Sequence, residues 1–410
     1  MFQFILIKNL RRLIREGNLI LQLPDHQFVS LGDGRGQKVI VRLTNRRIIR
    51  RLVLNPELAL GEGYTNGEIT IRDDNLHGLL EIVVRNYTDQ SLDWWAQGRK
   101  LIRGARQRFD QNNIVSIARR NVAHHYDLSG ELYDLFLDED RQYSCAYFAF
   151  PDSTLEEAQI YKKSHIAAKL LLQPGQRVLD IGCGWGGMAL SLAREYGVQV
   201  LGITLSQEQL NVATARARAA GLSDQVEFRL CDYRDVSGPF DRVVSIGMFE
   251  HVGEPHYDTY FKKVRDLLTP DGVALIHTIG RCAPPAATNP WISKYIFPGG
   301  YVPSMSEVLP VIENADLWLD DVEVWRLHYA TTLRHWFDRF QSNSDKAAAI
   351  YDDRFVRMWR FYLVASEQTF RFGKQVVFQF QLSRAQDAVP LTRDYLYNRM
   401  QLTQLSKAAE

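Results

Sequence analysis

Two ionisable side chains, Glu250 and His277, stand where neighbouring strands of a parallel sheet are predicted to end. Each follows a run of apolar residues, Glu250 in SIGMFEHVG and His277 in ALIHTIG. Parallel sheets bind ligands at the carboxyl ends of their strands, so both groups are predicted to converge on one site. A buried carboxyl is costly unless it is paired or used. The pair therefore favours proton-transfer chemistry, whereas a single histidine there would more often be structural.

A glycine-rich turn in VLDIGCGWGG adds a cofactor site to the same edge. Gly182, Gly184 and Gly186 lack side chains, so backbone N–H groups can approach a ligand. A nicotinamide dinucleotide site would prefer an acidic residue at the end of the next strand. That strand ends in ITLS, without a carboxylate. The turn therefore favours a different nucleotide-like cofactor.

Polar residues follow the next two predicted strands and have two interpretations each. Gln209 is a candidate for binding ribose hydroxyls, but Ser206 and Gln209 also fit a helix capping box. The two roles are compatible. Asp232 can accept from an adenine amino group and Tyr233 can stack on the ring, whereas the alternative is a polar turn. Their place after a strand favours the ligand interpretation.

The elements that position these residues follow from alternating strand and helix patterns. Strands are predicted at 177–181, 198–204, 226–230, 241–246, 273–278, 318–327 and 375–383, with helices ending at 196 or beginning at 207 and 256. This alternation predicts right-handed crossovers and a parallel sheet, an α/β Rossmann-like architecture. A proline-rich insertion at 280–305 is predicted to be a lid or binding element, because such long connections usually are.

The chain is predicted to divide into a small α+β domain (1–110) and a catalytic domain (111–410). In the first, residues 44–54 fit a short helix with four arginines on one arc: Arg46, Arg47, Arg50 and Arg51. Residues 98–108 form a second basic run. A solvated face and contact with anionic membrane lipid are equally favoured interpretations.

Composition sets further bounds on function. The 410 residues carry 49 Lys and Arg against 48 Asp and Glu, so the net charge of +1 gives no drive toward nucleic acid. The four cysteines are far apart and fit no metal-ligand spacing. No apolar run approaches the ~18 residues that a membrane span needs. A reduced cytosolic setting without a metal site is expected.

These segments together resemble the cyclopropane-fatty-acyl-phospholipid synthases and the related mycolic acid cyclopropane synthases. Further matching segments are HYDLS, QYSCAYF, TLSQEQ, DYRD, YDTYF, LIHTIG, WISKYIFPGG and HYATTL. The resemblance runs through nearly all of residues 120–380. The first domain resembles the small lipid-binding domain of the bacterial phospholipid enzymes, which favours a phospholipid substrate.

The resemblance implies a class I methyltransferase sheet that uses S-adenosylmethionine (SAM). The implied SAM contacts are Tyr143, Ser144, the glycine turn (Gly182, Gly184, Gly186), Thr204, Gln209, Asp232 and Tyr233. A bicarbonate ion is also implied beside the reacting carbons. Its implied cradle is Cys145, Glu250, His277, the backbone of Ile279 and Tyr329.

The implied reaction explains these residue types. Methyl transfer to an alkene leaves a carbocation, which aromatic faces stabilise without attacking it. Tyr126, Tyr147 and Phe148 are candidates for that role. The proton that leaves before ring closure is taken by bicarbonate, oriented by Glu250 and His277, or by Glu250 directly.

Two positions depart from the family pattern. Ser366 stands where many relatives carry a cysteine once proposed as a nucleophile, so a covalent cysteine mechanism is excluded there. Ala330 stands where phospholipid enzymes often have an acidic residue.

The expected function is cyclopropanation of unsaturated phospholipid acyl chains by a protein at the inner face of the membrane. Relatives of the phospholipid type are often dimers, and a homodimer would suit a membrane-surface enzyme. A methyl-branched or methylene product is the first alternative. A non-catalytic lipid-binding protein with a vestigial methyltransferase fold is the second, and the intact glycine turn and Glu250 oppose it.

Overall fold

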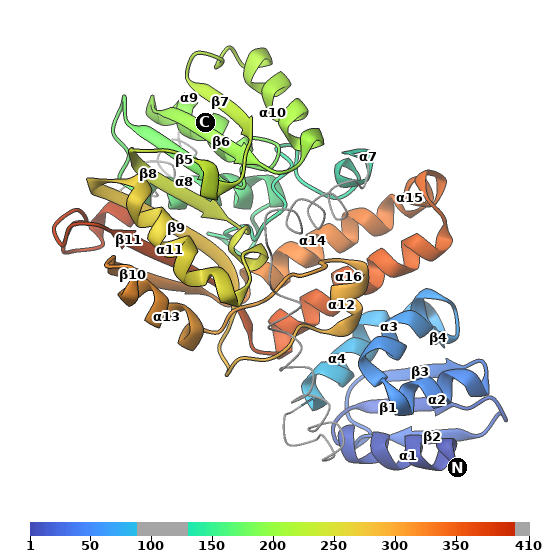
Figure 1. Cartoon of the computed structure of the whole chain (residues 1–410). Coiled ribbons are helices and arrows are strands. Elements are labelled where there is room, and N and C mark those ends of the chain that lie inside the picture. The colour runs from blue at the N-terminus through green and yellow to red at the C-terminus, as the bar shows by residue number, and fades with distance from the viewer. Residues whose placement is uncertain (88–129, 398–410) are drawn as a thin grey trace.

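The computed structural model describes residues 1–87 and 130–397, which are organised around two β-sheets (Figure 1). The larger sheet has seven strands in the order β10-β11-β9-β8-β5-β6-β7. Its strands are β5 (Arg177–Ile181), β6 (Gln199–Thr204), β7 (Val226–Leu230), β8 (Phe240–Ile246), β9 (Leu268–Arg281), β10 (Trp318–Trp325) and β11 (Gln375–Ser383). This is the class I methyltransferase arrangement that the sequence predicts.

Six strands of this sheet run in one direction, and β11 lies antiparallel between β9 and β10. The predicted bounds of β5, β7 and β11 agree with the structure. The bounds of β6, β8 and β10 differ by one or two residues, and the largest difference is at β9, which is longer at both ends than the predicted 273–278. Its extension to Arg281 is explained by β11, which pairs with it from Val273 to Arg281.

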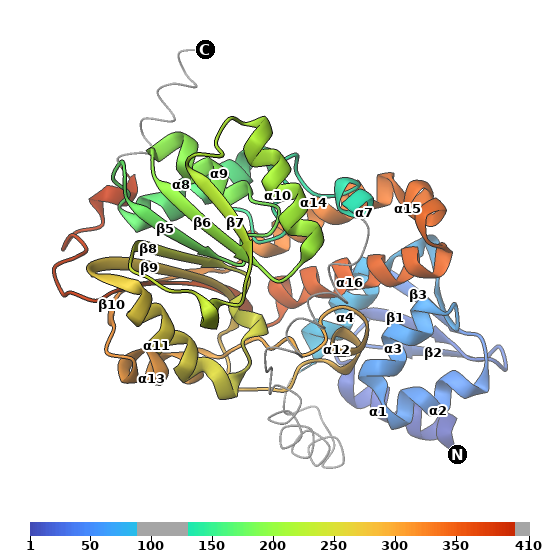
Figure 2. The same cartoon turned by 45° about the horizontal axis from the view of Figure 1, so that its top comes forward.

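Helices cover both faces of the larger sheet (Figure 2). Leucine, isoleucine and alanine side chains of α8 (Leu155–Leu170), α9 (Gly187–Tyr196) and α10 (Gln207–Ala219) pack on one face. Aromatic and aliphatic side chains of α11 (Tyr257–Leu267) and α13 (Met305–Asn314) pack on the other. Burial on both faces explains why the inner strands of this sheet are rich in apolar residues, whereas the outer strands β7 and β10 also carry charged residues.

The N-terminal unit is a small α+β fold around a four-stranded sheet of order β2-β1-β3-β4. Its elements are α1 (Phe2–Leu13), β1 (Asn18–Gln22), β2 (Phe28–Leu31), β3 (Lys38–Leu43), α2 (Arg46–Leu54), α3 (Pro56–Thr65), β4 (Ile69–Ile71) and α4 (Leu76–Asn86). In α2, Ile48 and Ile49 are buried while Arg46, Arg47 and Arg50 are exposed.

One arginine of the predicted basic arc is directed into the protein. Arg51 pairs with Glu62 of α3 and with Glu68, which precedes β4. The expectation that Arg51 belongs to a free basic surface is therefore wrong, because α3 and the turn before β4 place the carboxylates of Glu62 and Glu68 against it. The second basic run, 98–108, lies outside the described residues.

The N-terminal unit meets the larger one through α16 (Asp353–Phe372), which packs against α3 and α4 as well as α14 (His328–Ser342). Both views show α16 lying between the two units (Figures 1 and 2). The short helices α7 (Gly130–Asp134) and α15 (Ser344–Ile350) flank this region. Within the described part of the chain, no helix is long and apolar enough to cross a membrane.

The predicted lid insertion spans from the end of β9 to the N-terminal unit. Its helix α12 (Pro290–Tyr295) packs on α3, where a Cβ built at Gly61 would lie 2.5 Å from the Trp291 ring. Lys294 and Tyr295 both donate to Glu62, at 2.7 and 2.8 Å. The insertion is thus anchored at its centre, and a lid movement remains a prediction.

Candidate active site

A cavity of about 550 Å³ opens at the carboxyl end of β5, beside the glycine turn. Five residues predicted to contact SAM line it: Tyr143, Ser144, Gly182, Gly184 and Gln209. Their positions follow from the fold, because the turn leaves β5, Gln209 begins α10 beyond β6, and the segment before α8 supplies the other two. The sheet edge therefore collects these residues as the sequence predicts.

The three glycines of the turn have different roles. All three have positive φ, which favours glycine. A Cβ at Gly182 would lie 2.9 Å from Met248, and one at Gly186 would lie 2.6 Å from the Phe228 ring. A Cβ at Gly184 would meet nothing within 4 Å. Gly184 therefore faces open space that a ligand can occupy, whereas Gly182 and Gly186 are needed for close packing.

Gln209 is oriented by its neighbours rather than by the solvent. The Thr204 hydroxyl donates to Gln209 Oε1 at 2.8 Å, and the Ser206 side chain accepts from the Gln209 backbone N–H at 3.3 Å. The capping contact thus exists while the Gln209 amide remains at the cavity. Thr204 does not line the cavity itself and acts on Gln209.

Asp232 and Tyr233, at the start of the 3₁₀ turn Tyr233–Asp235, are not among the cavity-lining residues. The Asp232 carboxylate accepts two bonds of 2.8 Å from the Arg234 guanidinium. The Tyr233 ring packs edge-on against Tyr260, with 5.2 Å between centroids. Both side chains have protein partners here, and their contacts with adenine remain predictions.

Glu250 has one satisfied and one unsatisfied carboxylate oxygen. Its Oε1 accepts from the backbone N–H of Ile279, at the end of β9, at 2.7 Å. Its Oε2 is buried and has no hydrogen-bond partner in the described part of the chain. Burial raises the pKa of Glu250 to about 7, opposed by the Ile279 N–H. This carboxyl can therefore exchange a proton near neutral pH.

His277 lies near Glu250 along β9 but has other partners. Its Nδ1 is 3.0 Å from Gln379 Nε2 of β11, and its ring meets Trp325 edge-on at 5.1 Å. Burial and the nearby ammonium of Lys162 hold the pKa of His277 well below its usual value. No hydrogen bond between the His277 and Glu250 side chains is found among the described residues. The two are connected through β9, which carries His277 and whose Ile279 N–H donates to Glu250.

Two further predicted catalytic residues, Cys145 and Tyr329, lie in an aromatic core. Cys145 is fully buried, and burial raises the pKa of its thiol. Tyr329 of α14 packs against Trp336 and Phe370. Tyr126 lies outside the described residues.

The two other aromatic candidates for cation stabilisation stack on histidines. The Tyr147 ring stacks on His165 and on His328, with centroids 4.7 and 4.8 Å apart. The Phe148 ring stacks on His335 at 5.4 Å. Their faces are therefore partly covered, and a role in stabilising a cation remains a prediction.

Comparison with known proteins identifies the family. A family model described as mycolic acid cyclopropane synthetase matches residues 115–380. The chain belongs to this family. It is 40% identical over 346 residues to the cyclopropane-fatty-acyl-phospholipid synthase of Escherichia coli K12, covering 84% of this chain and 87% of that one. It is 35% identical over 391 residues to the tuberculostearic acid methyltransferase UfaA1 of Mycobacterium tuberculosis, covering 92% and 90%.

A solved structure supports the same assignment. Mycolic acid cyclopropane synthase CmaA1, complexed with SAH and CTAB, superposes with a TM-score of 0.61 at 36% identity. The match covers 64% of this chain and 97% of that one. The chain is thus a SAM-dependent methyltransferase of the cyclopropane synthase family, and the alternative of a non-catalytic lipid-binding protein is set aside.

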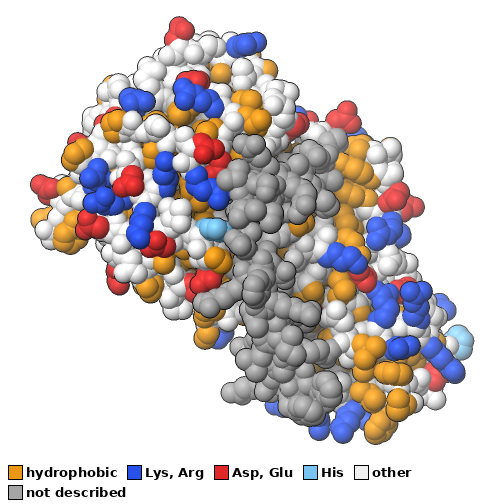
Figure 3. Space-filling view, in the orientation of Figure 1, with side chains coloured by type: hydrophobic (Ala, Val, Ile, Leu, Met, Phe, Trp, Pro, Cys, Tyr) orange, Lys and Arg blue, Asp and Glu red, His pale blue; other side chains and the backbone are white. Residues whose placement is uncertain are grey.

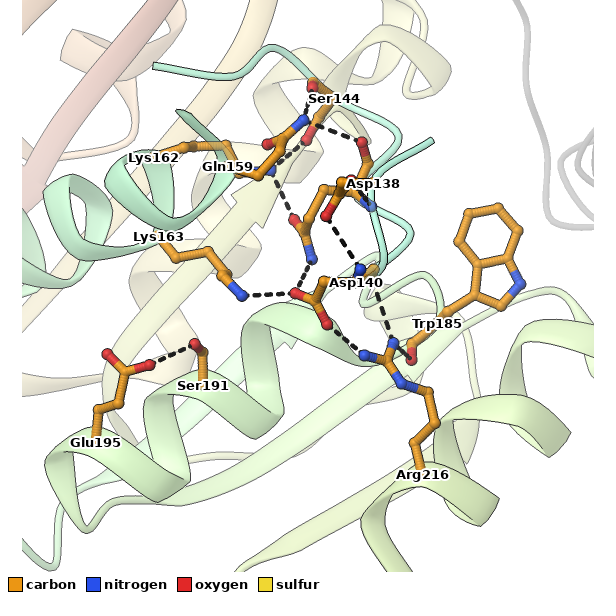
Figure 4. Close-up of polar contacts among 11 residues, drawn as sticks. Asp138, Asp140, Ser144, Gln159, Lys162, Lys163, Trp185, Ser191, Glu195 and Arg216 are labelled. Carbon is orange, nitrogen blue, oxygen red and sulfur yellow. Dashed lines mark hydrogen bonds and ion pairs between the residues drawn. The ribbon is translucent and has the colours of Figure 1, made fainter. Parts of the chain in front are cut away.

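In this family member, the sequence motifs miss the residues that hold the cavity wall. The Tyr143 hydroxyl lies 2.8 Å from that of Tyr362 on α16, more than 200 positions away. Asp140, just before the wall, pairs with Lys163 of α8 and Arg216 of α10 (Figure 4). The one available signal is on α8, where polar residues recur every three or four positions along a buried face.

Proposed function

We propose that this family member transfers a methylene unit from SAM to the cis double bond of unsaturated phospholipid acyl chains and forms a cyclopropane ring. The observation that carries the proposal is the buried Glu250 carboxyl with one oxygen unpartnered, which follows in sequence Ile246 and Gly247 of the cavity wall. Such a group is costly to keep unless it binds or accepts something. The match to the Escherichia coli phospholipid enzyme over 84% of the chain supports the substrate class.

The chemistry breaks three bonds, the C–S bond of SAM, the alkene π bond and one C–H bond of the transferred methyl group, and it forms two C–C bonds. The alkene electron pair bonds to the SAM methyl carbon as its C–S bond breaks, and S-adenosylhomocysteine (SAH) leaves. The other alkene carbon becomes a cation. Loss of a proton from the new methyl group then closes the ring. Tyr143 lines the cavity, so its ring is one that a cation beside the methyl donor would meet, at about 0.5–2 kcal/mol of stabilisation.

Bicarbonate fits this site because Glu250 Oε2 is a buried acceptor that a bound O–H group would satisfy. Cys145, Glu250, His277, Tyr329 and the backbone of Ile279 would hold it. When bound, it supplies a base for the methyl proton. Glu250, with a pKa near 7, is either the holder of that base or the acceptor itself. Turnover in bicarbonate-depleted buffer separates these two roles, because only the first requires the anion.

The N-terminal unit supplies a surface for peripheral contact with the inner face of the membrane. Arg46, Arg47 and Arg50 are exposed on α2, and Phe4 on neighbouring α1 is 73% exposed. Figure 3 shows Lys and Arg side chains beside hydrophobic ones over this unit. Basic side chains attract anionic lipid headgroups, and an exposed aromatic ring suits the interface. Arg51 is excluded because it is paired internally.

A second candidate product is a methyl-branched or methylene chain. The relative named tuberculostearic acid methyltransferase, which matches 92% of this chain, favours it. Both candidates share methyl transfer and differ only in how the cation is resolved.

The test is incubation with SAM and vesicles of unsaturated phospholipid, followed by mass analysis of the acyl chains. Either a ring or a methylene branch adds one CH₂ unit, and mild hydrogenation then separates them because only the branch takes up H₂. A methyl-branched saturated chain has a different mass. Acyl chains of unchanged mass, from a protein that binds SAM, would refute the proposal.

A further inference from the structure

A lysine that belongs to none of the motifs is completely buried behind the SAM cavity. Lys162 of α8 is 0% exposed, and its Nζ donates to Gln142 Oε1 at 2.6 Å and to Ser144 Oγ at 2.8 Å (Figure 4). On the same helix, Gln159 donates to the backbone carbonyls of Gln142 and Ser144. A buried ammonium is costly, so a position of this kind suggests a role beyond packing.

The donors of Lys162 determine how its two partners are oriented. An ammonium has no acceptor, so both contacted oxygens must accept. The Gln142 amide is held the same way from its other end, where Nε2 donates to Asp140 at 3.0 Å. Ser144 Oγ accepts from Lys162, so its own proton is directed elsewhere. Since Ser144 lines the cavity, that proton is available to a ligand there.

The polarity of the cavity indicates which part of SAM lies against Ser144. Gln209 is at the end where the ribose is expected, beyond β6. Ser144 and Asp180 line the same cavity from other elements, the segment before α8 and strand β5. Asp180 Oδ2 is buried and has no hydrogen-bond partner in the described part of the chain. Asp180 is an acceptor that matches the ammonium of an amino acid. Ser144 is a donor with the Lys162 cation behind it, and it matches the carboxylate.

We propose that Lys162 is a positioning residue for the carboxylate of SAM, acting through the Ser144 hydroxyl. The inference rests on SAM occupying this cavity, as assigned above. The ammonium fixes Ser144 as a donor toward the ligand and places a positive charge behind it. The hydrogen bond from the Ser144 hydroxyl to a carboxylate is charge-assisted and therefore stronger than one between two neutral groups.

The test compares two ligands that differ only at the proposed contact. SAH carries the amino acid group, whereas 5′-methylthioadenosine keeps the adenosine and sulfur and lacks both the carboxylate and the ammonium. By equilibrium binding, Lys162→Met is expected to lose about tenfold or more in SAH affinity and less than about threefold for 5′-methylthioadenosine. An equal loss for both ligands would mean that Lys162 only supports the fold, and no loss for SAH would also overturn the proposal.

The matched control is Lys163→Met, the adjacent lysine on α8. Lys163 donates to Asp140 at 2.6 Å rather than to Ser144. Its loss removes one charge from the same region and is expected to leave the ratio of the two affinities unchanged. A ratio that falls as much as in Lys162→Met would show a general charge effect and refute the specific contact.

Ser144→Ala keeps the test decisive if Lys162→Met does not fold. It removes the relay, so it is expected to show the same selective loss for SAH, and unchanged SAH binding would overturn the proposal. Where both variants fold, the double variant is expected to lose little more than either single one, because both act on one contact. Wild-type protein that binds neither ligand would instead refute the assignment of the cavity to SAM.

Discussion

Replacing Glu250 by glutamine is expected to make the protein more stable and almost inactive. The carboxyl has a pKa of about 7 in the folded protein, against 4.5 for the ordinary group, because it is buried with one oxygen unpartnered. The folded state therefore binds the proton more tightly than the unfolded state. Keeping Glu250 ionised at pH 8 then costs about 3 kcal/mol of folding free energy, at 1.36 kcal/mol per pKa unit. Glutamine keeps an acceptor for the Ile279 N–H without that cost.

The pH dependence makes this prediction specific. Because the folded pKa is raised, the contribution of Glu250 to stability is lost as pH rises from about 4.5 to about 7. Urea unfolding of the unliganded protein should give Glu250→Gln an advantage that grows by about 2–3 kcal/mol between pH 5 and pH 8. A difference between variant and wild type that does not change with pH would show that the carboxyl has an ordinary pKa and refute the reasoning.

Turnover is the second measurement on the same variant. Glutamine cannot accept the methyl proton, and its neutral amide is a weaker acceptor than a carboxylate for the O–H of a bound base, so the rate is expected to fall by about 10² or more. A folded Glu250→Gln protein whose turnover stays within about threefold of wild type, less than ~1 kcal/mol of barrier, would make Glu250 structural.

Three further predictions follow from other parts of the molecule. Gly184→Val should abolish SAM binding, because the valine side chain would enter the open space at the turn and a φ of +53° disfavours a β-branched residue. Calorimetry that gives wild-type SAM affinity in a folded variant would contradict this prediction. Ser366→Ala should keep turnover within about threefold, and a large loss of rate without unfolding would restore a chemical role at this position. Changing Arg46, Arg47 and Arg50 together to Gln should weaken binding to anionic vesicles by up to about 3 kcal/mol, less at high salt, with SAM binding unchanged. Equal co-sedimentation of variant and wild type at low salt would rule out that contact.

Local patterns predict the strands that are bounded by turns. The predicted strands at 177–181 and 226–230 each follow a polar loop that ends in a glutamine, and their predicted bounds agree with the structure. The end of β9 could not be predicted, because its extension depends on pairing with β11 nearly 100 residues later. The bond between Gln379 and His277 has the same non-local origin.

The same contrast applies to charged residues. The sequence correctly predicts that α2 turns its isoleucines inward, since helical spacing alone decides this. It cannot reveal that Arg51 meets Glu62 and Glu68, because those carboxylates reach it only when α3 and β4 pack beside α2. Lys162 is missed because a lysine on a helix usually faces solvent, whereas this one is fully buried.

The place of Ser366 in the fold explains how this position can matter without supplying a nucleophile. It lies on α16, the helix between the two units, and α16 does not contribute to the lining of the SAM cavity. The next residue, Glu367, is 0% exposed and contacts His77 of α4 at 3.1 Å and Arg371 at 3.0 Å. A substitution here therefore acts first on the packing between the N-terminal unit and the aromatic core around Tyr329. Changes of residue at this position are accordingly expected to alter how the units fit together rather than the proton transfer that we propose for Glu250.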